Sequence, residues 1–208
     1  MTDEMPGRPE ERIRALGRQP GEPRPGPAER LLAEAFVLFY EKGIRAVGVD
    51  LLIARSGVAK ATFYRYFPSK AALVAAYLAR RQEAWLAWLR DEVAARADTA
   101  EDRLLAVFDV LADLFADPDY HGCAAVNAVA EVAGEADAVL EVAVTQKAAC
   151  RDYLRGLAEE AGLEDPDEVT DAWMLLVDGA QVTAARQRGD TAPAGLARRA
   201  AELLLNGD

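Results

Sequence analysis

The sequence predicts an all-α protein of about nine helices. Apolar residues recur at spacings of three and four along most of the 208-residue chain, and no segment shows the period-2 alternation of a β-strand. Gly, Pro and acidic residues interrupt this pattern where helices are expected to begin and end. With 51% hydrophobic residues, the chain can bury a sizeable core.

The first predicted helix follows an N-terminal segment that we expect to be disordered. Residues 1–27 are rich in Pro and Gly, which block a long helix, and they lack the apolar stretch of a secretory signal. Their Arg residues leave two alternatives, a solvated tail or a basic arm that meets an anionic partner. From Ala28 the pattern changes to helical spacing, with an apolar stripe at Leu32, Ala35, Phe36 and Phe39.

This helix is expected to end at Lys42-Gly43, and three more helices should follow closely. A short one runs from about Asp50 to a break at Gly57, and another runs from near Ala59 to Phe67-Pro68. A long Ala- and Leu-rich helix begins after Ser69 and extends beyond Trp88. The remaining helices are expected at Thr99 to Pro118, Cys123 to Val132 with a break at Gly134, Val139 to Gly162, Asp165 to Gly189, and from Pro193 onward.

Charge is distributed unevenly along this acidic chain, whose formal net charge is −11. Residues 1–80 carry 13 Lys and Arg against 9 Asp and Glu, whereas residues 81–208 carry 11 against 26. Residues 51–82 contain no Asp or Glu, and four of their cations recur every five residues, at Arg55, Lys60, Arg65 and Lys70. Because Lys and Arg contacts with phosphate supply most non-specific affinity for nucleic acid, this segment predicts a polyanion-binding face.

The same segment has the elements of a helix-turn-helix motif, two short helices joined by a turn. Gly57 suits the turn because glycine adopts positive φ at little cost. Five apolar residues are expected to lock the two helices together, namely Ile53, Ala54, Val58, Phe63 and Phe67.

The predicted DNA contacts lie on the second helix of the motif and just beyond it. Small side chains at Ala59 and Ala61 let the backbone approach base edges, and Thr62 can offer a hydroxyl to phosphate or a methyl to thymine. Lys60 can reach guanine acceptors or a phosphate. The other predicted contacts hold the DNA backbone, through Tyr64, Arg65, Tyr66 and, at the start of the next helix, Lys70.

The run from Gly48 to Leu73 resembles the DNA-binding signature of the TetR family of transcriptional regulators. Its centre follows the pattern G-V-x-K-x-T-x-Y-x-x-F-x-S-K over residues 57–70. Two positions depart from the family. Ala59 stands where Ser is usual, which removes a hydroxyl that would contact phosphate, and Tyr66 stands where His is common.

The resemblance implies a cytoplasmic homodimer that binds a near-palindromic operator in double-stranded DNA, usually as a repressor, and is released by a small-molecule effector. It divides the chain into a disordered arm (residues 1–27), a DNA-binding domain of three helices (28–80) and an effector-binding and dimerisation domain (81–208). We expect no enzyme activity, cofactor, bound metal or membrane partner.

Two further sets of residues complete the prediction. Aromatic residues, with two polar residues in apolar stretches, are expected to line the effector pocket, unless they are ordinary core: Trp88, Phe108, Phe115, Asn127, Gln146, Tyr153 and Trp173. Stripes on the last two helices are expected to form the dimer interface, unless they complete the core of one subunit: Leu176, Val177, Ala180, Leu196, Ala200, Leu203 and Leu204.

Other interpretations have weaker support. The main rival is an α-helical ligand carrier or adaptor with a vestigial helix-turn-helix, and an enzyme comes third because a single histidine, His121, excludes most catalytic triads. His121 and Cys123 lack the further ligands of a tetrahedral zinc site, so we expect an ordinary loop there. The two cysteines, Cys123 and Cys150, are expected to be buried thiols in a reducing cytoplasm rather than a disulfide.

Overall fold

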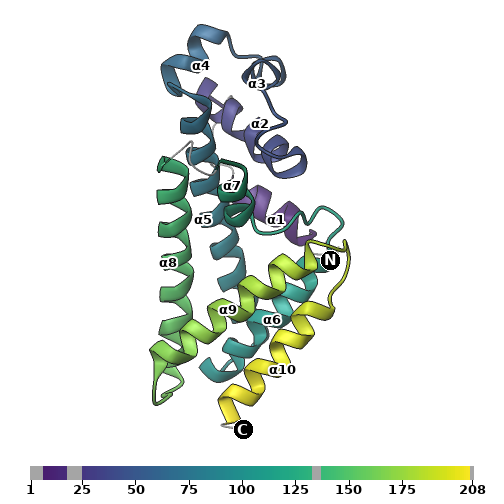
Figure 1. Ribbon diagram of the computed structural model, residues 1–208, viewed down its shortest axis with the longest axis vertical. Helices are drawn as coiled ribbons and strands as arrows, with labels where there is room; N and C mark the ends of the chain where they lie inside the picture. Colours follow the sequence, from purple (N-terminus) through teal and green to yellow (C-terminus); the bar gives the residue numbers. More distant parts are fainter. Residues whose placement is uncertain (1–6, 18–24, 133–136, 207–208) are drawn as a thin grey trace, which may run out of the picture. The chain divides into compact units, whose positions relative to one another are not determined.

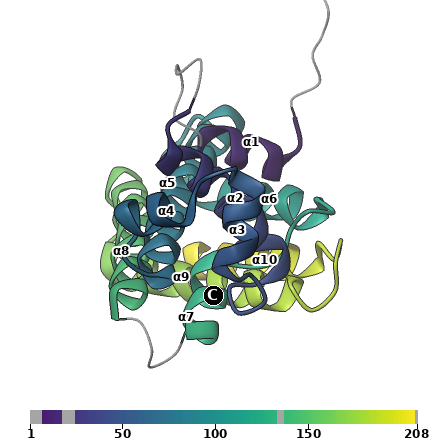
Figure 2. The same ribbon diagram turned by 90° about the horizontal axis from the view of Figure 1, so that it is seen from above.

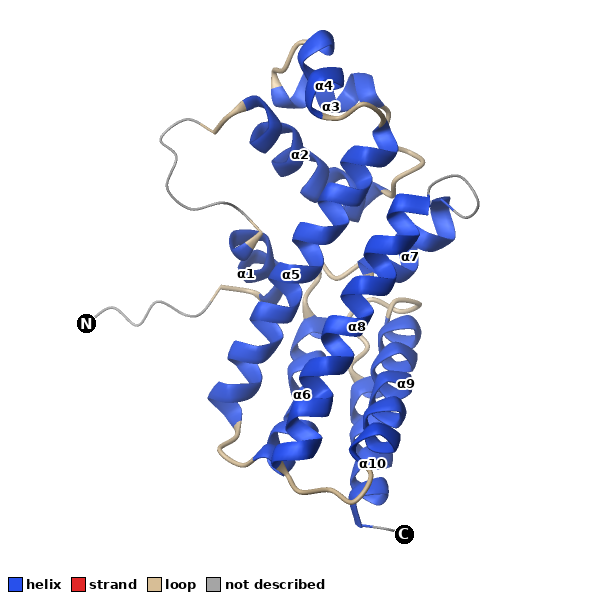
Figure 3. Ribbon diagram, turned by 90° about the vertical axis from the view of Figure 1, so that its left-hand side faces the viewer, coloured by secondary structure: helices blue, strands red, loops and turns tan. Residues whose placement is uncertain are grey.

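The computed structural model describes residues 7–17, 25–132 and 137–206, and every regular element in these ranges is an α-helix (Figure 3). The prediction of an all-α fold is confirmed. The break expected at Gly134 lies outside the described residues. No described helix is long and apolar enough to cross a membrane. In chain order the helices are α1 (Pro9–Leu16), α2 (Pro27–Lys42), α3 (Val49–Ser56), α4 (Lys60–Tyr66), α5 (Lys70–Arg96), α6 (Ala100–Ala116), α7 (Ala124–Val132), α8 (Asp137–Glu160), α9 (Pro166–Ala184) and α10 (Ala192–Asn206).

The chain divides into two compact units. Among the described residues, those within 16–85 and 124–147 form the helix-turn-helix unit, and those within 1–15, 86–123 and 148–208 form the C-terminal unit. The helices α5 and α8 cross the boundary, and each contributes its first part to the helix-turn-helix unit. This unit therefore includes α7, which was predicted to belong to a domain that starts at residue 81. The functional division at residue 80 stays a prediction.

The helix α2 forms the base of the helix-turn-helix unit. Its predicted apolar stripe is buried, with Leu32, Ala35, Phe36 and Phe39 each at most 8% exposed. The ring of Tyr77 on α5 packs edge-on against Phe36 and Phe39, with ring centroids 6.0 and 5.4 Å apart. Both α3 and α4 pack against α2, so the buried face of α2 fixes the position of the motif.

The C-terminal unit is built around α6, α9 and α10, which pack against one another, with α9 and α10 side by side in Figures 1 and 2. The predicted starts of α6 and α9 are confirmed by their N-caps. The Thr99 hydroxyl accepts a hydrogen bond from the backbone N–H of Asp102 at 3.1 Å. The Asp165 carboxylate accepts one from the N–H of Glu168 at 3.0 Å. Each cap satisfies a first-turn N–H that has no partner within its helix.

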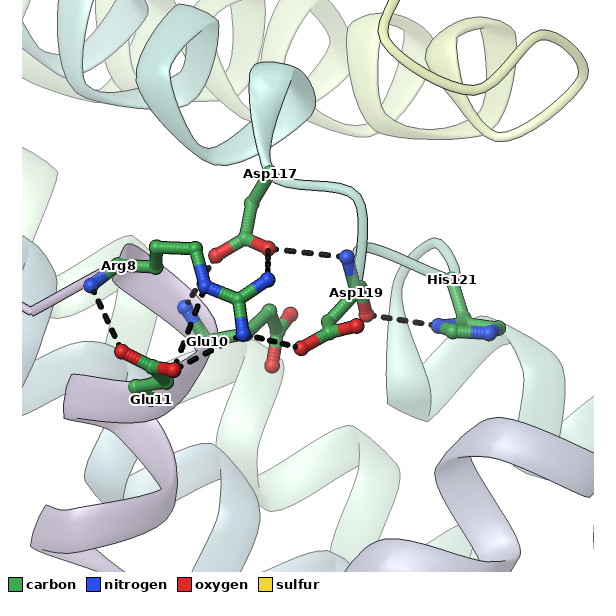
Figure 4. A network of polar contacts seen from close by, with 6 residues as sticks. All are labelled: Arg8, Glu10, Glu11, Asp117, Asp119 and His121. Carbon is green, nitrogen blue, oxygen red and sulfur yellow. Dashed lines mark hydrogen bonds and ion pairs between the residues drawn. The ribbon is translucent and has the colours of Figure 1, made fainter.

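The N-terminal segment corrects the prediction of a disordered arm, because part of it folds as α1. Ile13 of this helix is completely buried. The backbone N–H of Glu10 donates to the Asp117 carboxylate at 3.0 Å, and the Arg8 guanidinium lies 3.0 Å from the carboxylate of Asp119 (Figure 4). Residues 1–6 and 18–24, which belong to the same prediction, lie outside the described residues.

Two arginines of this segment, Arg8 and Arg12, form ion pairs within the C-terminal unit. Arg8 pairs with the acidic loop that follows α6, and Arg12 forms an ion pair with Glu92. The Pro content of the segment was misleading because Pro9 occupies the first position of the helix, where the missing N–H is not needed. We therefore assign α1 a structural role in this unit.

This role predicts a loss of stability when the buried side chain of α1 is shortened. Ile13→Ala should lower the free energy of unfolding by about 2–4 kcal/mol, because it removes fully buried methyl groups and leaves a cavity. Ala15→Ser, on the exposed side of the same helix, should stay within about 0.5 kcal/mol. Urea unfolding followed by tryptophan fluorescence measures both. Equal stability of Ile13→Ala and the wild type would show that α1 is not docked in solution.

Candidate nucleic-acid interface

The turn of the motif has the geometry that the sequence predicts. Gly57 ends α3 with φ 64° and ψ 24°, in the left-handed region, and its N–H donates to the carbonyl of Ile53 at 3.0 Å. An added Cβ at Gly57 would meet no atom within 4 Å, so the backbone conformation alone requires glycine here. Three residues later α4 begins at Lys60, and its N-cap Ala59 offers no side-chain hydrogen bond.

Apolar packing fixes the orientation of α4. Phe63 is completely buried, and Val58 and Phe67 are 3% and 8% exposed, as predicted. The prediction for Ala54 was wrong, because this residue is exposed and Leu52 takes the buried position on α3. The helical spacing of α3 places positions 52 and 56 inward, and position 54 lies half a turn away from them.

The face of α4 opposite Phe63 is exposed, and it carries most of the predicted DNA contacts. Tyr64 and Tyr66 are 46% and 45% exposed, which is unusual for large aromatic side chains. The Arg65 guanidinium lies 5.1 Å from the centroid of the Tyr66 ring, a cation–π contact. The structure also exposes Ala59, Lys60 and Ala61 and half-buries Thr62.

Residues 51–82 contain no Asp or Glu, but the fold places carboxylates from outside this segment close to two of its cations. Arg55 lies 3.1 Å from the Glu34 carboxylate. Lys60 lies 3.5 Å from Asp50, and both of these side chains are exposed. Exposed pairs of this kind are weak, so Lys60 can exchange Asp50 for a phosphate at small energetic cost.

Lys70 has a different environment from the one expected. It is half-buried, and its ammonium donates to the backbone carbonyl of Ile44 at 2.5 Å. Burial lowers the pKa of the Lys70 ammonium, and the attraction of the Glu131 carboxylate opposes this shift. We therefore assign Lys70 first to the turn between α2 and α3, whereas its predicted phosphate contact stays a prediction.

Comparison with known proteins agrees with this geometry. Residues 31–77 match the family described as bacterial regulatory proteins, tetR family. A TetR-type transcriptional regulator from Streptomyces avermitilis is 30% identical, covers 86% of this chain and 99% of its own, and superposes with a TM-score of 0.72. The chain belongs to the TetR family of transcriptional regulators.

Two further relatives support the assignment. A TetR-family regulator from Streptomyces coelicolor is 28% identical over 87% of this chain and 95% of its own, with a TM-score of 0.74. The HTH-type transcriptional regulator YjdC of Escherichia coli is 25% identical over 151 residues, which are 73% of this chain and 79% of that protein. As a member of the TetR family, the protein is a DNA-binding transcriptional regulator and not an enzyme.

The residues predicted to form the effector pocket are divided between the two units. Trp88, Phe108, Phe115 and Trp173 are buried in the C-terminal unit, and Tyr153 is half-buried there. The structure places the two polar members, Asn127 and Gln146, in the helix-turn-helix unit instead, and Asn127 is exposed. The pocket itself stays a prediction.

Two buried polar atoms of the C-terminal unit lack a hydrogen-bond partner among the described residues. They are the indole Nε1 of Trp88 and the side-chain Oε1 of Gln181. The second indole of this core is satisfied, because Trp173 Nε1 donates to the Leu104 carbonyl at 3.0 Å. Gln181 did not appear in the sequence prediction because no pattern distinguishes an inward-facing Gln in a helix from an exposed one.

The single histidine takes part in a contact between loops of the C-terminal unit. His121 Nδ1 lies 2.7 Å from the carbonyl oxygen of Asp119, and its Nε2 lies 3.1 Å from the Arg188 guanidinium. A neutral ring that donates from Nδ1 and accepts at Nε2 satisfies both contacts. Both cysteines are buried thiols.

The predicted dimer residues lie on two different faces of α9 and α10. Val177 and Ala180 are 1% and 5% exposed, so they belong to the core of the C-terminal unit, which corrects their assignment to the interface. They share the inward face with Trp173, at helical spacings of four and three. Leu176 and Ala200 are half-buried. On α9 and α10, the large apolar side chains that face solvent in the single chain are Leu175, Val182, Leu196, Leu203 and Leu204.

The different environments of Arg65 and Lys70 predict different mutant phenotypes. Arg65→Ala should weaken binding to all DNA and lower the slope of log K against log salt by about 0.9, as expected for one lost phosphate contact, with unchanged stability. Lys70→Ala should also lower the free energy of unfolding by about 1 kcal/mol, because the Ile44 carbonyl loses its donor. Salt-dependent fluorescence anisotropy and urea unfolding test both variants.

Arg186→Ala serves as the control, since it removes an exposed cation from the turn that follows α9. Neither the salt slope nor the stability of this variant should change. An Arg65→Ala variant with the salt slope of the wild type would contradict the assignment of Arg65 to the DNA backbone.

Proposed function

We propose that the protein is a cytoplasmic repressor that binds an inverted-repeat operator as a homodimer and is released by an uncharged small molecule. The exposed face of α4, with Lys60, Arg65, Tyr64 and Tyr66 around small Ala61, is the observation that carries the DNA-binding part. Small residues there permit close approach to base edges, and the flanking cations and tyrosines can reach phosphates.

The dimer is supported by the exposed apolar side chains of α9 and α10. Leu175 and Leu196 are 76% and 60% exposed, and Leu203 and Leu204 exceed 50%. A second copy related by two-fold symmetry would cover these side chains and form a four-helix interface. The two-fold axis would hold two α4 helices at a fixed separation, which an operator with half-sites one helical turn apart requires.

Mobility shifts with the intergenic DNA beside the gene test the operator and the dimer together. We expect one complex of two subunits on an inverted repeat, and at least tenfold weaker binding when one half-site is scrambled. Leu175→Glu with Leu196→Glu should give folded monomers, because both side chains are exposed in the single chain, and these monomers should bind weakly. A wild type that sediments as a monomer at micromolar concentration, or binds one half-site equally well, would refute this part.

The effector class is inferred from the core of the C-terminal unit. The buried side chains there are almost all apolar, and they include the large rings of Trp88, Phe108 and Trp173. Trp88 Nε1 and Gln181 Oε1 are a buried donor and a buried acceptor without a partner among the described residues. A buried polar group without a partner costs about 1–3 kcal/mol, which a ligand can recover. We therefore propose a largely apolar, uncharged effector that accepts one hydrogen bond and donates another.

Trp88→Phe tests this assignment, because it removes the indole N–H and keeps an aromatic ring. Uncharged compounds would first be screened for release of the wild type from operator DNA. For the compounds that release it, Trp88→Phe should weaken effector binding about 5–10-fold, as expected for one lost hydrogen bond, with operator affinity within about twofold. Unchanged affinity for every releasing compound would rule out Trp88 as the donor.

A further inference from the structure

A residue outside the helix-turn-helix motif holds the turn between α2 and α3. The Glu131 carboxylate, near the end of α7, accepts a hydrogen bond from the backbone N–H of Arg45 at 2.8 Å. In the opposite direction, the Arg45 guanidinium donates from Nε to the backbone carbonyl of Glu131 at 2.6 Å. Both residues belong to the helix-turn-helix unit. Two hydrogen bonds therefore join the last turn of α7 to the turn that precedes α3.

Glu131 is in a position that α7 alone would disfavour. A helix carries partial negative charge at its C-terminal end, so a carboxylate in the last turn is repelled. The last turn of α7 has no basic residue of its own. Arg45 supplies the missing positive charge and also satisfies one of the terminal carbonyl groups. A local preference that is broken and then compensated by a specific partner is typical of a functional constraint.

The turn is also shaped to accept this side chain. Gly43 has φ 85°, and an added Cβ there would lie 3.1 Å from Glu131 Oε2. Next along the turn, Ile44 and Val47 are 5% and 0% exposed and anchor it by apolar packing. The Lys70 ammonium binds the Ile44 carbonyl, and Glu131 is the carboxylate that acts on this ammonium. Backbone, apolar and charged contacts therefore converge on residues 43–47.

We propose that Glu131 is a positioning residue for DNA binding. By fixing the N–H of Arg45, it fixes the turn from which α3 starts at Val49, and α3 packs against α4 and against α2. It acts through the backbone and makes no contact with DNA. Without the carboxylate the turn samples more conformations, and DNA binding then has to order it, which lowers affinity. The role in DNA binding rests on the proposed function.

The test compares variants for which charge and positioning predict opposite results. Removal of any carboxylate from the helix-turn-helix unit reduces repulsion of DNA, so Glu141→Ala, at an exposed position on α8, should bind operator as well as the wild type or better. Glu131→Ala should bind about tenfold more weakly, despite the same change in charge. Glu131→Gln loses the charge but keeps an oxygen acceptor for the Arg45 N–H, and it should retain the affinity of the wild type.

A second measurement does not depend on DNA. Hydrogen exchange at the Arg45 amide should accelerate about tenfold in Glu131→Ala and remain slow in Glu131→Gln and Glu141→Ala. Should Glu131→Ala fail to fold, Glu131→Asp replaces it, because it keeps the charge and withdraws the acceptor by one methylene. The same losses of affinity and of amide protection are expected for this variant.

The outcomes separate this inference from the proposed function. A wild type that binds no DNA refutes the proposed function, and slow exchange at Arg45 would still establish the contact in solution. If the wild type binds operator, unchanged affinity in Glu131→Ala overturns the positioning role. A loss of affinity in Glu131→Gln equal to that in Glu131→Ala also overturns it, because the charge rather than the acceptor would then matter.

Discussion

Burial of Phe63 decides which side of α4 faces solvent, and the proposed DNA contacts depend on this packing. The ring is completely buried, while Tyr64 and Tyr66, one and three residues further along α4, are nearly half exposed. A helix turns by about 100° per residue, so one fixed aromatic anchor sets the orientation of all seven residues of α4. The left-handed turn at Gly57 and the buried Val58 lead the chain into this orientation. The exposure of the α4 cations Lys60 and Arg65 follows from this orientation.

Features that depend on neighbouring residues could be predicted from the sequence. The N-caps at Thr99 and Asp165, the turn at Gly57 and the apolar stripe of α2 each arise from interactions within about one or two helical turns. The exposed face of α4 could also be predicted, because its spacing and its cations lie within one segment of seven residues.

Features that depend on distant parts of the chain could not be predicted in this way. Arg45 and Glu131 are 86 residues apart, and nothing near either of them indicates the other. On α9 the sequence shows one broad apolar region, whereas the fold divides it into a core side with Val177 and a solvent side with Leu175. The helix α1 was missed because composition alone does not show that Ile13 has a surface against which to pack.

Hydrogen exchange with and without operator DNA reports on each segment of one intact protein, so it measures directly which surface binds DNA. We expect DNA to slow exchange in residues 57–66 and at the start of α5, and to leave α6 unchanged. Protection confined to the C-terminal unit, or equal protection throughout the chain, would contradict the assignment of the exposed face of α4 as the surface that binds DNA.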